Sequence, residues 1–239
     1  MTGDDIEGST RDIAIFMDLL GHDIQNSNQA VLSYLELILS SPATDEKTKK
    51  YAVRAASQIR TSSILVDNMK TLMSIRDISE RKLPDVDLRQ VIEQSAVKLR
   101  GLFSDRRIKI DSSGIAAGTI VPIGAYADEL FDSLLMNIVH LSKNEEISIK
   151  VDPQKDVMAD MPCWRICIRT SDMNMPTMFV KDLADISSSD DLSKIVRISG
   201  IYFAGTMAKA LGGRLEMTVS ENGSGCTFTL ILRMSDTHD

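Results

Sequence analysis

His22 is the residue of this sequence best suited to covalent chemistry, because Asp23 and Asn26 stand where they could act on its ring. A solvent-facing imidazole nitrogen is a competent nucleophile, and a nearby carboxylate can hold the ring tautomer and raise its basicity. Asn26 follows four residues later, on the same face of a helix, and could position a water against a group attached to the histidine. On spacing alone, a histidine on a solvated helix face is more often an ordinary surface residue.

A long helix is predicted to carry these residues. From Thr10 to Leu39 the sequence has one glycine and no proline. Apolar or small residues recur there at alternating spacings of four and three: Ile13, Met17, Leu20, Ile24, Ser27, Val31, Tyr34 and Ile38. This heptad pattern is typical of a helix packed in a coiled-coil-like bundle. In that register His22 lies farthest from the stripe, so we expect its imidazole to face solvent.

A second helix is predicted after a break at residues 40–44, where Thr44, Asp45 and Glu46 offer a cap and an acidic first turn. Its own stripe has spacings of three and four: Ala52, Ala55, Ile59, Ser62, Val66, Met69 and Met73. Two helices joined by a short loop form an antiparallel hairpin, which cannot bury its apolar stripe alone. We therefore expect a homodimer in which two hairpins build a four-helix bundle.

The polar stretch 79–85 contains Pro84 and is predicted to link two domains, residues 1–80 and 81–239. In the second domain we expect a helix capped by Asp87, and helices over Asp128–Leu141 and Gly200–Leu211. Strands are expected at 108–110, 119–122, 146–151, 163–170, 214–218 and 227–232. Interspersed strands and helices indicate an α+β domain with its helices layered on one sheet face. Trp164, Ile166 and Ile168 would then point inward, and Arg165 and Arg169 outward.

The run Leu-Leu-Gly-His-Asp-Ile-Gln-Asn at 19–26 resembles the H-box of two-component sensor histidine kinases, in a form common in archaeal kinases. This resemblance implies that His22 accepts a phosphoryl group on a ring nitrogen and that Asp23 acts as the base. It also implies that Asn26 orients water for dephosphorylating a bound response regulator. The proline that often follows this asparagine is Ser27 here, which removes a helix kink but no chemistry.

The helix around residues 129–140 looks like the N-box of the GHKL (Bergerat-like) ATP-binding domain, an α/β sandwich. Segments 200–215 and 223–230 are similar to that family's glycine box, Gly-Gly turn and closing hairpin. The resemblance implies that Asn137 holds Mg²⁺ and that Asp172, Gly200 and Thr227 contact ATP. The family's earlier asparagine is Ser133 here.

The expected nucleotide-binding loops depart from the family's pattern. Asp172-Met-Asn-Met-Pro176 stands where the family has Asp-x-Gly-x-Gly, and Pro176 has a fixed φ and no N–H. Gly200 remains in the box before the last helix, but Ile198 replaces another glycine. Loops that cradle phosphate need bare backbone N–H groups at close approach. The sequence therefore leaves open whether ATP and Mg²⁺ bind.

Composition and charge exclude several classes of partner and cofactor. The 239 residues carry a formal net charge of −7, so we expect no nucleic-acid partner. The longest apolar runs are too short to span a bilayer, and the acidic N-terminus is unlike a secretory signal. Three cysteines make neither a disulfide framework nor a complete metal set. We expect a cytoplasmic protein without membrane insertion and without a structural metal.

Three functions fit these residues. The first is histidine-kinase-type phosphoryl transfer through His22 to an aspartate of a response-regulator receiver domain, with ATP as the source. The second is a kinase-like histidine phosphotransferase or phosphatase that does not bind ATP. The third, of another class, is a non-catalytic dimeric scaffold or binding module. Because no sensor domain is recognisable, the input would come from a separate sensor protein, the bundle itself or a removed segment.

Overall fold

The computed structural model describes residues 3–74, 83–142, 144–171, 199–220 and 225–235. The chain divides into two compact units, Met1–Ser74 and Ile75–Asp239, which are treated separately below. The predicted linker and its boundary at residue 80 lie mostly outside the described residues. In the described parts of the chain, no helix is both long enough and apolar enough to cross a membrane.

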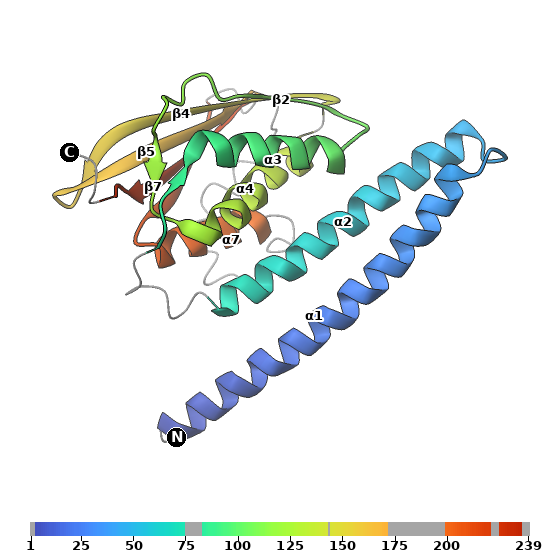
Figure 1. Ribbon diagram of the computed structural model, residues 1–239, viewed down its shortest axis with the longest axis horizontal. Helices are drawn as coiled ribbons and strands as arrows, with labels where there is room; N and C mark the ends of the chain where they lie inside the picture. Colours follow the sequence, from blue (N-terminus) through green and yellow to red (C-terminus); the bar gives the residue numbers. More distant parts are fainter. Residues whose placement is uncertain (1–2, 75–82, 143, 172–198, 221–224, 236–239) are drawn as a thin grey trace. The chain divides into compact units, whose positions relative to one another are not determined.

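The first unit is a helical hairpin of α1 (Gly3–Ser40) and α2 (Glu46–Ser74), shown in blue and cyan in Figure 1. Asp45 caps α2, since its Oδ1 accepts hydrogen bonds from the backbone N–H groups of Lys47 and Thr48. Thr44 instead closes the end of α1, where its hydroxyl donates to the Ile38 carbonyl over 2.8 Å. The short polar loop thus satisfies both helix ends.

The hairpin contact uses a different stripe of α1 from the predicted one. Among the described side chains of α1, a less exposed stripe has spacings of four and three: Gly21, Gln25, Asn28, Leu32, Leu35 and Leu39. Met17 and Ile24 of the predicted stripe are also half-buried. Most of the predicted stripe stays exposed in the single chain, with Tyr34 at 68% and Leu20, Val31 and Ile38 at about 40%. At 3.6 residues per turn the two stripes lie about a quarter of a turn apart. Helix α1 therefore has one stripe for α2 and a second that the hairpin leaves uncovered.

In its described residues, the second unit has a five-stranded sheet with three helices on one face (Figure 1). The helices are α3 (Leu88–Leu102), α4 (Ala127–Leu141) and α7 (Ser199–Ala210). The strands are β2 (Arg107–Asp111), β4 (Glu146–Met158), β5 (Met161–Thr170), β6 (Arg214–Val219) and β7 (Cys226–Arg233). Their order is β2-β4-β5-β7-β6, and only the β2–β4 pair is parallel. A helical hairpin followed by a mixed α/β domain is the α+β arrangement that the sequence predicts.

Three details differ from the sequence-based expectation. A two-residue strand β1 (Val86–Asp87) pairs with β3 (Ile120–Val121), and a 3₁₀ turn η2 (Gly124–Tyr126) precedes α4. Strand β4 runs seven residues past its predicted end at Val151, because it forms a long hairpin with β5. Ala159 and Asp160 close that hairpin with φ values of 49° and 62°, the left-handed geometry of a two-residue hairpin turn.

Strand alternation divides the sheet into two faces with different chemistry. The inner face, under the helices, is apolar and fully buried at Ile147, Ile149, Val151, Ile166, Ile168, Phe228 and Leu230. The outer face carries the charged residues between them, among them Lys150, Asp152, Arg165 and Arg169. Trp164, Ile166 and Ile168 point inward and the two arginines outward, as predicted. The Trp164 indole N–H donates to the Ile120 carbonyl over 2.8 Å and so joins β3 to the sheet.

The predicted cap of α3 can be tested by unfolding. Asp87 accepts a hydrogen bond from the backbone N–H of Gln90 over 3.1 Å. Asp87→Ala should lower the free energy of unfolding of the second unit by about 1 kcal/mol, measured by urea titration of the full chain. Asp105→Ala removes an exposed carboxylate outside any cap and should change it little. Equal losses in both variants would contradict the capping role.

Candidate functional site

The structure displays His22 to solvent near the middle of α1, as predicted. Its side chain is 71% exposed and that of Asp23 is 84% exposed. The ring nitrogen Nδ1 lies 3.8 Å from Asp23 Oδ1 and 3.2 Å from Asn26 Nδ2. The structure thus brings together the three residues that the H-box pattern singles out. They lie on a face of α1 that is distinct both from the face that contacts α2 and from the uncovered apolar stripe.

Both contacts of the imidazole involve Nδ1, which determines what the ring can do. A proton on Nδ1 can be held by the Asp23 carboxylate and, with its amide turned, by the Asn26 oxygen. In that tautomer Nε2 carries a lone pair and is the nucleophilic nitrogen. An electrophile can reach it without displacing either neighbour. The arrangement therefore supplies an exposed nucleophile together with a carboxylate that stabilises the cationic ring formed when Nε2 is alkylated or phosphorylated.

Asn137 and Gly200 meet where α4 crosses α7, in the helix layer of the second unit. The Asn137 side chain is 8% exposed, and its Nδ2 donates to the Ser133 carbonyl over 3.1 Å. The Ser133 hydroxyl in turn donates to the Gly200 carbonyl over 3.3 Å. A Cβ at position 200 would lie 2.8 Å from Asn137 Cγ and 2.9 Å from Ser133 Oγ. Glycine is thus required at position 200 by helix packing alone.

Thr227 lies on the outer face of the sheet, away from Asn137 and Gly200. It stands opposite the outward Arg169 of β5 and Thr218 of β6, whereas the next residue, Phe228, is fully buried on the inner face. The inward residue at this end of β7 is Cys226, and burial raises the pKa of its thiol to about 12. Strand alternation from Phe228 could have revealed this, because it places Thr227 outward in any register.

The predicted nucleotide residues are therefore not gathered around one site by the described part of the chain. Asn137 and Gly200 touch each other, Thr227 lies across the sheet from them, and Asp172 falls outside the described residues. The Asn137 amide is already engaged by its own helix and pressed against α7. As placed, Asn137, Gly200 and Thr227 do not fit Mg-ATP as a set.

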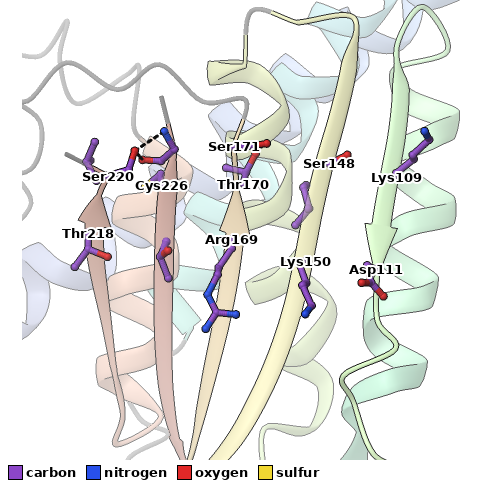
Figure 2. A pocket seen from close by; sticks show the side chains of 14 residues that line it. Lys109, Asp111, Ser148, Lys150, Arg169, Thr170, Ser171, Thr218, Ser220 and Cys226 are labelled. Carbon is purple, nitrogen blue, oxygen red and sulfur yellow. Dashed lines mark hydrogen bonds between the residues drawn. The ribbon is translucent and has the colours of Figure 1, made fainter. Parts of the chain in front are cut away.

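A shallow depression of about 740 Å³ lies at one end of the outer face (Figure 2). Thr227 is among the residues that line it. Its cationic side chains are Lys109, Lys150 and Arg169, which rise from three adjacent strands. Each has a carboxylate partner: Glu146 for Lys109, and Asp152 for both Lys150 and Arg169. The sequence did not single out this surface, and its charges largely cancel.

Metal and disulfide chemistry find no support among the described residues. No three histidine, cysteine or carboxylate side chains gather there in a way that could hold a metal ion. Cys163, Cys167 and Cys226 are buried free thiols. His140, at the end of α4, packs edge-on against Phe103 with 5.0 Å between ring centroids, and burial lowers its pKa. It is a packing residue in this structure.

The close contact at Gly200 yields a test with a matched control. Gly200→Ala places a methyl group against Asn137 and Ser133 and should lower the free energy of unfolding by about 1–3 kcal/mol. Gly101→Ala, in the exposed face of α3, meets nothing within 4 Å and should raise it by about 0.5–1 kcal/mol. Urea unfolding of both variants measures the difference. Opposite signs are expected, and a stabilised Gly200→Ala variant would refute the crowded contact.

Comparison with known proteins shows what the fold of this chain resembles. No protein-family model matches the sequence. The chain is 24% identical over 158 residues to the phytochrome-like protein Cph1 of Synechocystis sp., a match that covers 63% of this chain and 20% of that protein. The chain thus spans about a fifth of the length of this relative.

Solved structures of histidine kinases are similar in fold to most of the chain. Full-length ShkA, crystallised in complex with AMPPNP, matches 92% of this chain and 46% of its own, with a TM-score of 0.52 and 15% identity. The histidine kinase AdeS of Acinetobacter baumannii matches 88% of this chain and 97% of its own, with a TM-score of 0.48 and 18% identity. The hairpin and the mixed sheet domain together form a histidine-kinase-like fold.

Proposed function

We propose that this chain acts in two-component signalling by transferring a phosphoryl group between His22 and an aspartate of a response-regulator receiver domain. The observation that carries the proposal is the exposed imidazole whose described contacts both lie at Nδ1. The histidine-kinase-like fold supports it, because the H-box lies on the first helix of the hairpin in this chain. A scaffold function alone would not require a carboxylate and an amide around that ring.

The transfer step balances without an added reactant. Nε2 of His22 attacks the phosphorus of the receiver's aspartyl phosphate, so that an N–P bond forms as the P–O bond to the aspartate breaks. The aspartate leaves as a carboxylate, and the Nδ1 proton stays on a ring that is now cationic. Asp23 stabilises that charge from 3.8 Å in the described geometry, and Asn26 can hold the same proton. In the reverse direction the receiver's carboxylate attacks phosphohistidine.

The phosphoryl group is proposed to come from a phosphorylated receiver domain, because Asn137, Gly200 and Thr227 are not gathered into a nucleotide site. Autophosphorylation of His22 with Mg-ATP is the competing source. The experiment below separates the two. A separate sensor protein would then act upstream of that receiver.

The same proposal includes a homodimer through the uncovered stripe of α1. Leu20, Val31, Tyr34 and Ile38 line that stripe, and Met69 of α2 is also exposed. Two hairpins that pair these stripes would bury them in a four-helix bundle. The face with His22 lies on the other side of α1 from that stripe, so dimer formation would leave the imidazole accessible.

Labelling distinguishes the candidate functions. The full chain incubated with a ³²P-labelled receiver domain should acquire an acid-labile, base-stable label, and His22→Ala should lose it because the N–P bond cannot form. His238→Ala, which removes another histidine, should keep the label. A parallel incubation with labelled Mg-ATP should give none. Label from ATP would support autophosphorylation instead, and no label from either donor would leave the scaffold as the remaining function.

The proposed dimer interface can be tested by introducing a charged side chain into the uncovered stripe of α1. Tyr34→Glu should convert the dimer to monomers in sedimentation-velocity ultracentrifugation, because an unpaired carboxylate cannot be buried in an apolar bundle core without a large cost. Ser33→Glu puts the same charge beside it on an exposed face of α1 and should leave the dimer intact. Identical sedimentation of the two variants would rule out this stripe as the interface.

A further inference from the structure

Part of the contact between α1 and α2 is polar, and it lies beside His22. Gln25 Nε2 donates to the Ser63 backbone carbonyl over 3.0 Å and to Asp67 Oδ1 over 2.9 Å. Asn28 Nδ2 donates to the Ser63 hydroxyl over 3.1 Å, and the Asn28 side chain is almost completely buried. We call these four residues the polar bridge. It ties one turn of α1 to one turn of α2.

Two further contacts fix the same level of the hairpin. Asp18 Oδ1 lies 3.3 Å from Lys70 Nζ, so an ion pair joins the helices one turn before His22. Gly21 is buried against α2, where a Cβ would lie 3.1 Å from Val66 Cγ1 and 2.6 Å from Lys70 Cε. The helices can approach closely here because residue 21 has no side chain. These contacts all lie within ten residues of His22.

The described part of the seam that leads to the loop is made differently. Toward the loop, α1 presents Leu32, Leu35 and Leu39, and α2 presents the small buried residues Ala52 and Ala56. Apolar packing is not directional, so such a seam resists separation but specifies axial register and rotation weakly. Hydrogen bonds between named groups do specify them, at some cost in stability. The directional contacts described above therefore lie on the part of α1 that carries the reactive imidazole.

We propose that Gln25, through the polar bridge, is a positioning residue for phosphoryl transfer at His22. This inference rests on the function proposed above. Gln25 follows His22 by three residues and so lies one turn away on the neighbouring face. If α1 turned or slid against α2, Nε2 would move with it by an ångström or more relative to a docked receiver. Misplacement on that scale is enough to slow a group transfer greatly.

The primary test uses Gln25→Leu, which keeps the size of the side chain and removes its hydrogen bonds. The contacts of Gln25 are part-buried or exposed, so water can reach the Ser63 carbonyl and the Asp67 carboxylate once the amide is gone. The thermal midpoint of the full chain should therefore fall only a little. The rate constant of transfer at saturating phosphorylated receiver should fall about tenfold. The receiver concentration for half-maximal rate should stay the same. Gln58→Leu, at an exposed position of α2, should change none of these quantities.

A rescue separates positioning from general damage. Gln25→Glu sets a second carboxylate against Asp67 and should slow transfer. Adding Asp67→Asn restores the bond between these two side chains with donor and acceptor exchanged, but not the bond to the Ser63 carbonyl, and should recover part of the rate. Recovery in the double variant would show that the contact between α1 and α2 matters, whereas a rate that stays low would count against it.

Hydrogen exchange gives a readout that does not depend on catalysis. Backbone amides at residues 21–28 should exchange faster in Gln25→Leu than in the wild type, with no change in Gln58→Leu. If wild-type His22 takes no phosphoryl group, the proposed function fails, and the exchange result still decides whether the polar bridge fixes the local register. The inference would be overturned if Gln25→Leu transferred the phosphoryl group at the wild-type rate and its amides at residues 21–28 exchanged as in the wild type. So would a rate loss matched by a large fall in the thermal midpoint.

Discussion

Helix α1 has three faces with different tasks, and its rotation against α2 fixes the orientation of all of them. The other features of the hairpin depend on this rotation. One face packs on α2 through Gly21, Gln25 and Asn28. A second, about a quarter of a turn away, carries the uncovered apolar stripe. The third presents His22 to solvent. Because a helix is rigid over a few turns, setting its rotation against α2 sets the direction of all three faces together.

In the second unit, the corresponding constraint is the close approach of two helices. Helices α4 and α7 approach so closely that Gly200 touches Asn137 and Ser133, and the buried face of the sheet is closed by large apolar side chains beneath them. Asn137 and Gly200 are residue types that could contact a nucleotide, but here they form the contact between α4 and α7. The same two residue types can thus satisfy a sequence motif and a helix crossing, and only the positions of their neighbours tell the two uses apart.

The elements of the fold could be predicted because their periodicities are regular. The stripe at Val31, Tyr34 and Ile38 is apolar and easily found, whereas the stripe that contacts α2 includes Gly21, Gln25 and Asn28 and escapes a search for apolar residues. The outward position of Thr227 was available from strand alternation and was missed because the family motif took precedence. The long end of β4 could not be predicted, since Pro153 and its polar neighbours are held in the sheet by pairing with β5.

Among the described residues of the second unit, the helices cover only the inner face of the sheet, yet Cys163 and Cys167 on the outer face are buried. Their neighbours are Arg165, which is paired with Asp156, and Arg169, which is paired with Asp152. Long arginine stems laid along a sheet exclude water from what lies beneath them. Burial also raises the pKa of Cys163, so its thiol stays protonated and slow to oxidise. Salt that weakens these surface ion pairs should therefore make the thiols beneath the arginines more accessible, so that their reactivity depends on ionic strength.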